Sequence, residues 1–238
     1  MEQHRGLVCA CAHRLHFDMT RSGARLAWEY FNPREPLPAL LAHIEDRDLW
    51  RWALPQTDAF LSHLDVVVQS FESWHAVAQF APAQVALFVR DGEPMAVKFK
   101  ALCAQIAGDA HPIQLLGHAG LAVSSGRAFA SDVGNILAQQ CGTFAAVYYP
   151  HARELKVSLR AVSGFDVEQL ARRFGGGGHK AAAAFRLPLT DLPALLAGSL
   201  QPSVDSLAAA PTRPTTDRDR ARAKTAPRSP AAHLALRA

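Results

Sequence analysis

The sequence predicts a mixed α/β protein in which an α/β first part, whose signals are mostly helical, is joined by a long helix to a smaller α/β part with a mixed sheet. Apolar residues recur at helical spacing as far as about residue 80, and strand patterns appear only after about residue 110. A run of four glycines, Gly175–Gly178, separates a short helix from a strand in the second part. The expected divisions are 1–56 for a first domain, 57–82 for the joining helix, 83–198 for a second domain and 199–238 for a tail.

Two helices are expected in the first part and at the junction. After Pro36, apolar residues from Leu37 to Ile44 follow i, i+3, i+4, i+7 spacing, which predicts a helix that runs into the acidic segment 45–48. A longer apolar stripe predicts one helix from Thr57 to about Phe80. Such a helix could connect two domains.

Strands and helices are expected in the second part after an ambiguous stretch that ends near Ala107. Ser131 is a candidate N-cap for a helix that stops at Gly142. In the strand that begins at Leu155, apolar residues alternate with polar ones, so Lys156, Ser158 and Arg160 should share a face. The expected strands are Ile113–Val123, Phe144–Tyr149, Leu155–Val162 and Ala181–Leu187, and a further helix is expected over Asp166–Phe174.

The charge of the chain is concentrated in its tail. The formal net charge of the 238 residues is +4, and the residues from Gln201 onward contain seven Lys and Arg against three Asp. The first 200 residues are therefore neutral, so binding of a polyanion needs a local site. The tail has no apolar period, and we expect it to be disordered. Four scattered cysteines, no signal-peptide pattern and no apolar run near 18 residues predict a cytoplasmic protein without a membrane span.

The glycine run and the two residues after it, His179 and Lys180, predict a phosphate-binding segment. Glycine is unfavourable in folded chains unless the backbone needs a positive φ or a close approach. Amides of Gly175–Gly178 could form a nest for an anion, His179 could donate to a phosphate oxygen, and Arg160 could bind the same phosphate. A helix C-cap would need only one glycine. A P-loop is rejected because His179 separates Gly178 from Lys180 and no Ser or Thr follows.

The residues around this segment carry a family resemblance. The motifs are Ser131-Asp132-Val133-Gly134-Asn135, Val157-Ser158-Leu159-Arg160, Phe165-Asp166-Val167, and Gly175 to His179 followed by Ala182-Ala183 and Phe185. Together they resemble the DHH-associated C-terminal domain of DHH-superfamily phosphoesterases. The resemblance implies that Arg160, Gly175, Gly176, Gly177, Gly178 and His179 bind the phosphate and nucleotide of the substrate, with Ser131 and Asn135 lining the same pocket.

The segments 17–28 and 44–50 resemble the end of the catalytic domain of the same superfamily. The resemblance therefore implies that residues 1–56 are a remnant of that domain and that the chain is N-terminally truncated. Complete members hold a paired metal centre, usually Mn²⁺, on motifs that this sequence lacks, and Asp46 is the candidate for a remaining ligand, with Asp48 as the alternative. A cluster near the start of the chain, Cys9, Cys11, His13 and His16, has the wrong spacing for a structural zinc site.

The leading hypothesis is a truncated, metal-dependent phosphoesterase related to enzymes that cleave phosphodiesters of short oligonucleotides or nucleotide phosphates with Mn²⁺. We expect weak activity or none, because two metal ions need several carboxylate and imidazole ligands. Mn²⁺ is the cofactor that the resemblance implies, and a chain that binds no metal is the alternative. The alternative is a nucleotide or nucleic-acid binding module without catalysis. A third hypothesis is a non-functional fragment, and a misassigned start site would restore the enzyme.

Overall fold

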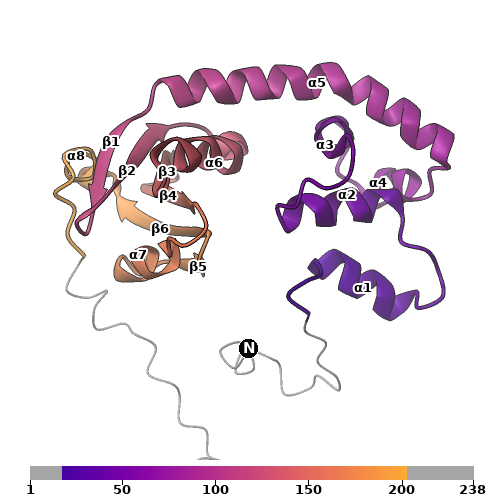
Figure 1. The fold of residues 1–238 in the computed structure, drawn as a ribbon, viewed down its shortest axis with the longest axis horizontal. Coiled ribbons are helices and arrows are strands. Elements are labelled where there is room, and N and C mark those ends of the chain that lie inside the picture. Colours follow the sequence, from indigo (N-terminus) through magenta and orange to yellow (C-terminus); the bar gives the residue numbers. More distant parts are fainter. Residues whose placement is uncertain (1–17, 203–238) are drawn as a thin grey trace, which may run out of the picture. The chain divides into compact units, whose positions relative to one another are not determined.

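A computed structural model describes residues 18–202 of the chain, which fall into two compact units. The first unit ends at Gly108 and the second begins at Asp109 (Figure 1). The fold class is mixed α/β, as the sequence predicts. No helix among the described residues is long and apolar enough to cross a membrane.

The first unit consists of helices packed around the start of one long helix. A small core joins the helices from residue 39 onward and includes the fully buried Phe60, whereas the first helix contributes no buried residue. Helix α3 packs closely on α5, where Gly92 leaves no room for a side chain because a Cβ there would lie 2.0 Å from the Ala59 carbonyl oxygen. The helices are α1 (Gly23–Phe31), α2 (Ala39–Asp48), α3 (Thr57–Leu64), α4 (Phe71–Ala78) and α5 (Pro82–Gly108).

The helical boundaries differ from the prediction between residues 57 and 108. The single helix expected from Thr57 to about Phe80 is two helices, α3 and α4, separated by residues 65–70. The β-branched run there disfavours helix, and Ser70 caps α4 by accepting a hydrogen bond from the Ser73 amide. Pro82 begins α5, which continues through Pro94. The ambiguous stretch before Ala107 is therefore the longest described helix, and the unit boundary lies at its end.

The second unit is built on a six-stranded mixed sheet of order β1-β2-β3-β4-β6-β5. Only the β2–β3 pair is parallel. The strands are β1 (His111–Leu115), β2 (His118–Ser124), β3 (Phe144–His151), β4 (Glu154–Ala161), β5 (Gly177–His179) and β6 (Ala182–Pro188). The helical segments are η2 (Arg127–Phe129), α6 (Ala130–Cys141), α7 (Val167–Arg173), η3 (Leu189–Asp191) and α8 (Leu192–Leu196).

Two helices cover different faces of this sheet. Val157 of β4, with its neighbours Tyr148 and Phe185 in the adjacent strands, belongs to the main core together with α7. Arg160 is an odd number of residues away, so it points to the opposite face. There it contacts α6, because a Cβ at Gly134 would lie 2.8 Å from the Arg160 Cγ.

Two local predictions in this unit are corrected by the structure. The strand expected over Ile113–Val123 is a hairpin, β1–β2, that turns at Leu116 and Gly117, whose φ angles are 51° and 82°. Ser131 is not the N-cap of α6, since the helix begins at Ala130 directly after η2. The C-cap prediction is confirmed, because Gly142 ends α6 with a left-handed φ of 72°.

Candidate phosphate-binding site

Arg160 and His179 lie in one row across the sheet. Arg160 of β4 is the register partner of Ala182 in β6, and Ala182 is the partner of His179 in β5. Residues directly opposite in antiparallel strands point to the same face, so both side chains lie on the face that carries α6. Two strand spacings put their Cα atoms roughly 10 Å apart. The side chains of Arg160 and His179 are long enough to contact one phosphate across that distance, because only the small side chain of Ala182 lies between them.

Arg160 is half-buried and held by two uncharged acceptors. Its Nη2 donates to Ser131 Oγ at 2.7 Å, and its Nη1 donates to the Leu159 carbonyl oxygen at 2.8 Å. Burial lowers the pKa of this guanidinium, and the charges of Asp132 and Tyr149 oppose that effect. A guanidinium has five N–H donors, so donors remain after these two bonds. The side chain is oriented in advance and can donate to an anion.

Helix α6 supplies the second wall of the site. Ser131 lies on its first turn and bonds Arg160, and Asn135 lies one turn later, half-buried. Gly134 between them lets the helix lie against the Arg160 side chain. Gly134 shapes the site but is not among the site residues that the sequence predicts. A glycine in the middle of a helix was its signal in the sequence.

The four glycines form a helix end and an edge strand. Gly175 follows α7 with a φ of 73°, and the Gly176 amide donates to the Ala171 carbonyl at 2.9 Å. A Cβ on Gly176 would lie 2.1 Å from the Ala184 carbonyl oxygen, and one on Gly178 would lie 2.5 Å from that of Ala182. Close approach to β6 therefore requires glycine at both positions, and Gly177 begins strand β5.

This geometry changes what the glycines can do for a ligand. The sequence led us to expect a nest of amides, whereas residues 177–179 pair with β6 and lie at the edge of the sheet. The outer side of an edge strand presents backbone groups that no neighbouring strand uses. Exposed His179 lies on this edge in the row of Arg160. The arrangement offers a guanidinium, an imidazole and edge amides to a phosphate.

Asp46, the candidate metal ligand, is buried in the first unit and fully engaged in hydrogen bonds. Its Oδ1 accepts from the Ala53 amide at 2.8 Å, and its Oδ2 accepts from the Leu54 amide at 3.1 Å and from Thr57 Oγ1 at 2.7 Å. Burial acts to raise the pKa of Asp46, but these bonds outweigh it and lower the pKa. The carboxylate holds the chain that follows α2. Asp48, the alternative, is exposed.

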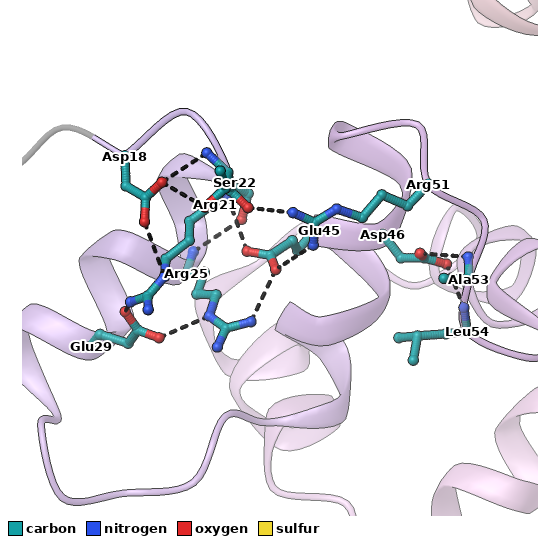
Figure 2. A network of polar contacts seen from close by, with 11 residues as sticks. Asp18, Arg21, Ser22, Arg25, Glu29, Glu45, Asp46, Arg51, Ala53 and Leu54 are labelled. Carbon is teal, nitrogen blue, oxygen red and sulfur yellow. Dashed lines mark hydrogen bonds and ion pairs between the residues drawn. The ribbon is translucent and has the colours of Figure 1, made fainter.

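A second buried acid, Glu45, organises the surrounding polar network (Figure 2). Its carboxylate accepts from the Ser22 amide at 3.0 Å, from Arg25 Nη1 at 3.0 Å and from Arg51 Nη1 at 3.3 Å. Burial acts to raise the pKa of Glu45, and these contacts lower it overall. The network joins the start of α1 to the end of α2 and the following loop. Figure 2 shows that Glu45 and Asp46, although adjacent in sequence, accept hydrogen bonds from different residues.

The described residues do not form the metal centre that the resemblance implies. Within residues 18–202, no three or more His, Cys, Asp or Glu side chains gather in a way that could hold a metal ion. The pair of Mn²⁺ ions therefore finds no complete ligand set there. The Cys9, Cys11, His13 and His16 cluster and most of the basic tail lie outside the described residues.

Comparisons with known proteins agree with the sequence motifs. Residues 114–199 match the family model of the DHHA1 domain. The uncharacterized protein R106 of Acanthamoeba polyphaga mimivirus is 31% identical over 176 residues, which are 70% of this chain and 41% of that protein. The chain thus spans about two fifths of the length of this curated relative.

Solved structures are similar only at a distance. The pGpG-specific phosphodiesterase PggH of Vibrio cholerae matches with 13% identity and a TM-score of 0.42 over 74% of this chain and 71% of that chain. RecJ of Thermus thermophilus, in complex with Mn²⁺, matches with 17% identity and a TM-score of 0.40 over 63% of this chain and 23% of that chain. Scores below 0.5 are too low to support a conclusion about this chain.

The domain match confirms the predicted resemblance. Residues 114–199 enclose every motif from Ser131 to Phe185 on which the resemblance was based. Residues 114–199 therefore carry a DHHA1 domain.

Proposed function

We propose that the second unit is the substrate-binding domain of a phosphoesterase that acts on phosphodiesters of short oligonucleotides or on nucleotide phosphates. The observation that carries the proposal is the row formed by Arg160, Ala182 and His179. Arg160 is oriented by Ser131 and by the Leu159 carbonyl, neither of which neutralises its charge. Because the first 200 residues are neutral overall, such a local site is what an anionic ligand would need.

In this proposal Arg160 donates paired hydrogen bonds to the phosphate, and His179 donates from the sheet edge. The guanidinium is matched in shape to two phosphate oxygens. Ser131 positions Arg160, and Asn135 extends the same wall toward the nucleotide. The site would bind one phosphate and the adjacent nucleoside, with no readout of an extended sequence.

Binding by variants of the chain tests the proposal. Titration with a nucleoside monophosphate and a short oligoribonucleotide should show that Arg160→Ala weakens both ligands by roughly 10- to 150-fold, the equivalent of one or more hydrogen bonds to a charged group. His179→Ala should weaken both by a smaller factor. Arg160→Lys keeps the charge and the aliphatic packing and should lose part of the affinity.

Matched controls come from the same unit. Arg172 is exposed on α7 and pairs with Glu168, and His151 is exposed at the far end of β3. Arg172→Ala and His151→Ala should bind as the wild type does. Wild-type affinity in both Arg160→Ala and His179→Ala, together with native circular dichroism, would contradict the proposed phosphate site.

Catalysis is a separate part of the proposal. Hydrolysis in this superfamily requires metal ligands beyond those that residues 18–202 bring together, so we propose that the 238-residue chain alone is weakly active or inactive. Its alternative role is a nucleotide or nucleic-acid binding module without catalysis. Incubation of the purified chain with a short oligoribonucleotide and Mn²⁺ separates these roles, because turnover at ordinary enzymatic rates would contradict the inactive chain.

A further inference from the structure

The tryptophan loop, residues 50–56 in the first unit, has an unusual backbone. Trp50, Trp52 and Gln56 have left-handed φ angles of 53°, 51° and 62°. This region is unfavourable for residues with a Cβ, and bulky side chains are rare there. Three such residues within seven positions indicate a conformation that the rest of the fold imposes.

Contacts from α2 and from the polar network around Glu45 impose this backbone. The carboxylate of Asp46 accepts from the amides of Ala53 and Leu54, and the Asp46 carbonyl accepts from the Arg51 amide at 2.8 Å. The Arg51 guanidinium bonds Glu45 and the Thr20 carbonyl oxygen. The loop is therefore fixed through its backbone amides and through the Arg51 side chain (Figure 2).

The fixed loop presents two indoles at the surface. The rings of Trp50 and Trp52 meet edge to face, with centroids 5.2 Å apart and an interplanar angle of 83°. Their exposed fractions are 37% and 39%, so each ring is partly supported and partly open to solvent. The core of the first unit is formed by other residues and includes neither ring. Packing of the core thus does not explain why the backbone is held in this conformation, and strained segments of this kind concentrate at ligand sites.

We propose that the tryptophan loop is a stacking site for an unpaired base of a single-stranded oligonucleotide. An indole face stacks on any nucleobase, and the edge-to-face partner fixes the ring in one orientation before the ligand arrives. A protein partner would need about 800 Å² of complementary surface. Two half-covered indoles and Leu54 offer much less than that, whereas a single base needs only one ring face.

This inference rests on the proposed function and extends it. The second unit would bind phosphate, and the tryptophan loop would bind a base of the same class of ligand. Two ligands are compared in variants of the tryptophan loop: a five-nucleotide single-stranded RNA, and an abasic sugar–phosphate chain of the same length. Both carry the same phosphates, and only the first can stack.

The experiment measures binding of both fluorescently labelled ligands to the full 238-residue chain by anisotropy. Trp50→Ala or Trp52→Ala should weaken the base-bearing RNA by roughly 5- to 150-fold and leave the abasic chain unchanged. Trp50→Phe should keep most of the affinity because it keeps an aromatic face. Phe71→Ala is the matched control, since Phe71 is 78% exposed on α4 in the same unit and lies outside the loop.

The tryptophans also provide a direct signal. The indole nitrogens of Trp28 and Trp74 are buried, so quenching of intrinsic fluorescence by the RNA should come from the loop and disappear in the double variant of Trp50 and Trp52. Equal affinity of the wild-type chain for the RNA and the abasic ligand would overturn the stacking site. So would unchanged RNA binding in both alanine variants with native circular dichroism. Arg160→Ala tests the phosphate site independently and should weaken the binding of both ligands. Unchanged affinity in this variant would contradict the phosphate site and leave the stacking site untouched.

Discussion

Replacement of Asp46 by alanine should destabilise the first unit because this carboxylate holds the loop after α2. It accepts three hydrogen bonds, from the amides of Ala53 and Leu54 and from Thr57 Oγ1. Hydrogen bonds to charged groups contribute about 1.5–3 kcal/mol each, but the two amides belong to exposed residues, where water can replace the carboxylate. The buried Thr57 hydroxyl loses this acceptor and keeps its contact with His43 Nδ1 at 2.9 Å and a longer one with the Leu54 carbonyl oxygen at 3.4 Å. We therefore expect a loss of about 3 kcal/mol in the free energy of unfolding.

Urea unfolding of the chain, followed by circular dichroism and by tryptophan fluorescence, measures this loss. Asp48→Asn is the control, because Asp48 is exposed near the end of the same helix and should change the free energy by less than about 0.5 kcal/mol. If Asp46→Ala unfolds at the wild-type urea concentration and instead loses Mn²⁺ binding, the structural role is wrong and a metal role is favoured.

The same carboxylate predicts a dependence of stability on pH. The pKa of Asp46 in the folded chain is below its ordinary value of 3.8. Its stabilising effect is therefore complete above the unfolded pKa and is lost as the pH falls through the folded value. Asp46→Asn should flatten the fall in stability below about pH 4. An acid-unfolding profile as steep as that of the wild type would contradict this expectation.

Two glycines should be intolerant of larger residues for reasons that the contacts make specific. Gly92→Ala should separate α3 from α5 and cost several kcal/mol, because its Cβ would overlap the Ala59 carbonyl, whereas Gly108→Ala meets no atom within 4 Å and should be neutral or slightly stabilising in thermal unfolding. Gly134→Val should push α6 away from Arg160 and weaken nucleotide binding, because the added side chain would overlap the Arg160 Cγ. Equal nucleotide affinity in this variant and in the wild type would contradict the packing argument.

Much of the second unit could be predicted from the sequence because local patterns and contacts agree there. Alternation along β4 placed Lys156, Ser158 and Arg160 on one face, which the register confirms. Asp166 and Gly142 mark helix ends by their side-chain and backbone chemistry. The pairing of residues 177–179 with β6 was not predictable, since three residues with two glycines carry no strand pattern.

The first unit shows where periodicity misleads. The apolar stripe continued through residues 65–70 and hid the break between α3 and α4, although Val66 and Val68 are exposed at 64% and 73%. In α5, Gly92 and Pro94 interrupt the helical pattern, so a helix of 27 residues was ambiguous in the sequence. The role of Asp46 depends on amides seven and eight residues later. These contacts depend on the path of the loop after α2, which no sequence motif indicates.

The most direct test of the account is to locate a phosphate on the second unit. In amide-resolved NMR spectra of the chain, addition of a nucleoside monophosphate should shift the signals of residues 177–179 and of Ser131, together with the side-chain signals of Arg160. Signals of α7, on the other face of the sheet, should move little. Shifts confined to α7, or none around Arg160 and His179 at millimolar ligand, would contradict the proposed phosphate site.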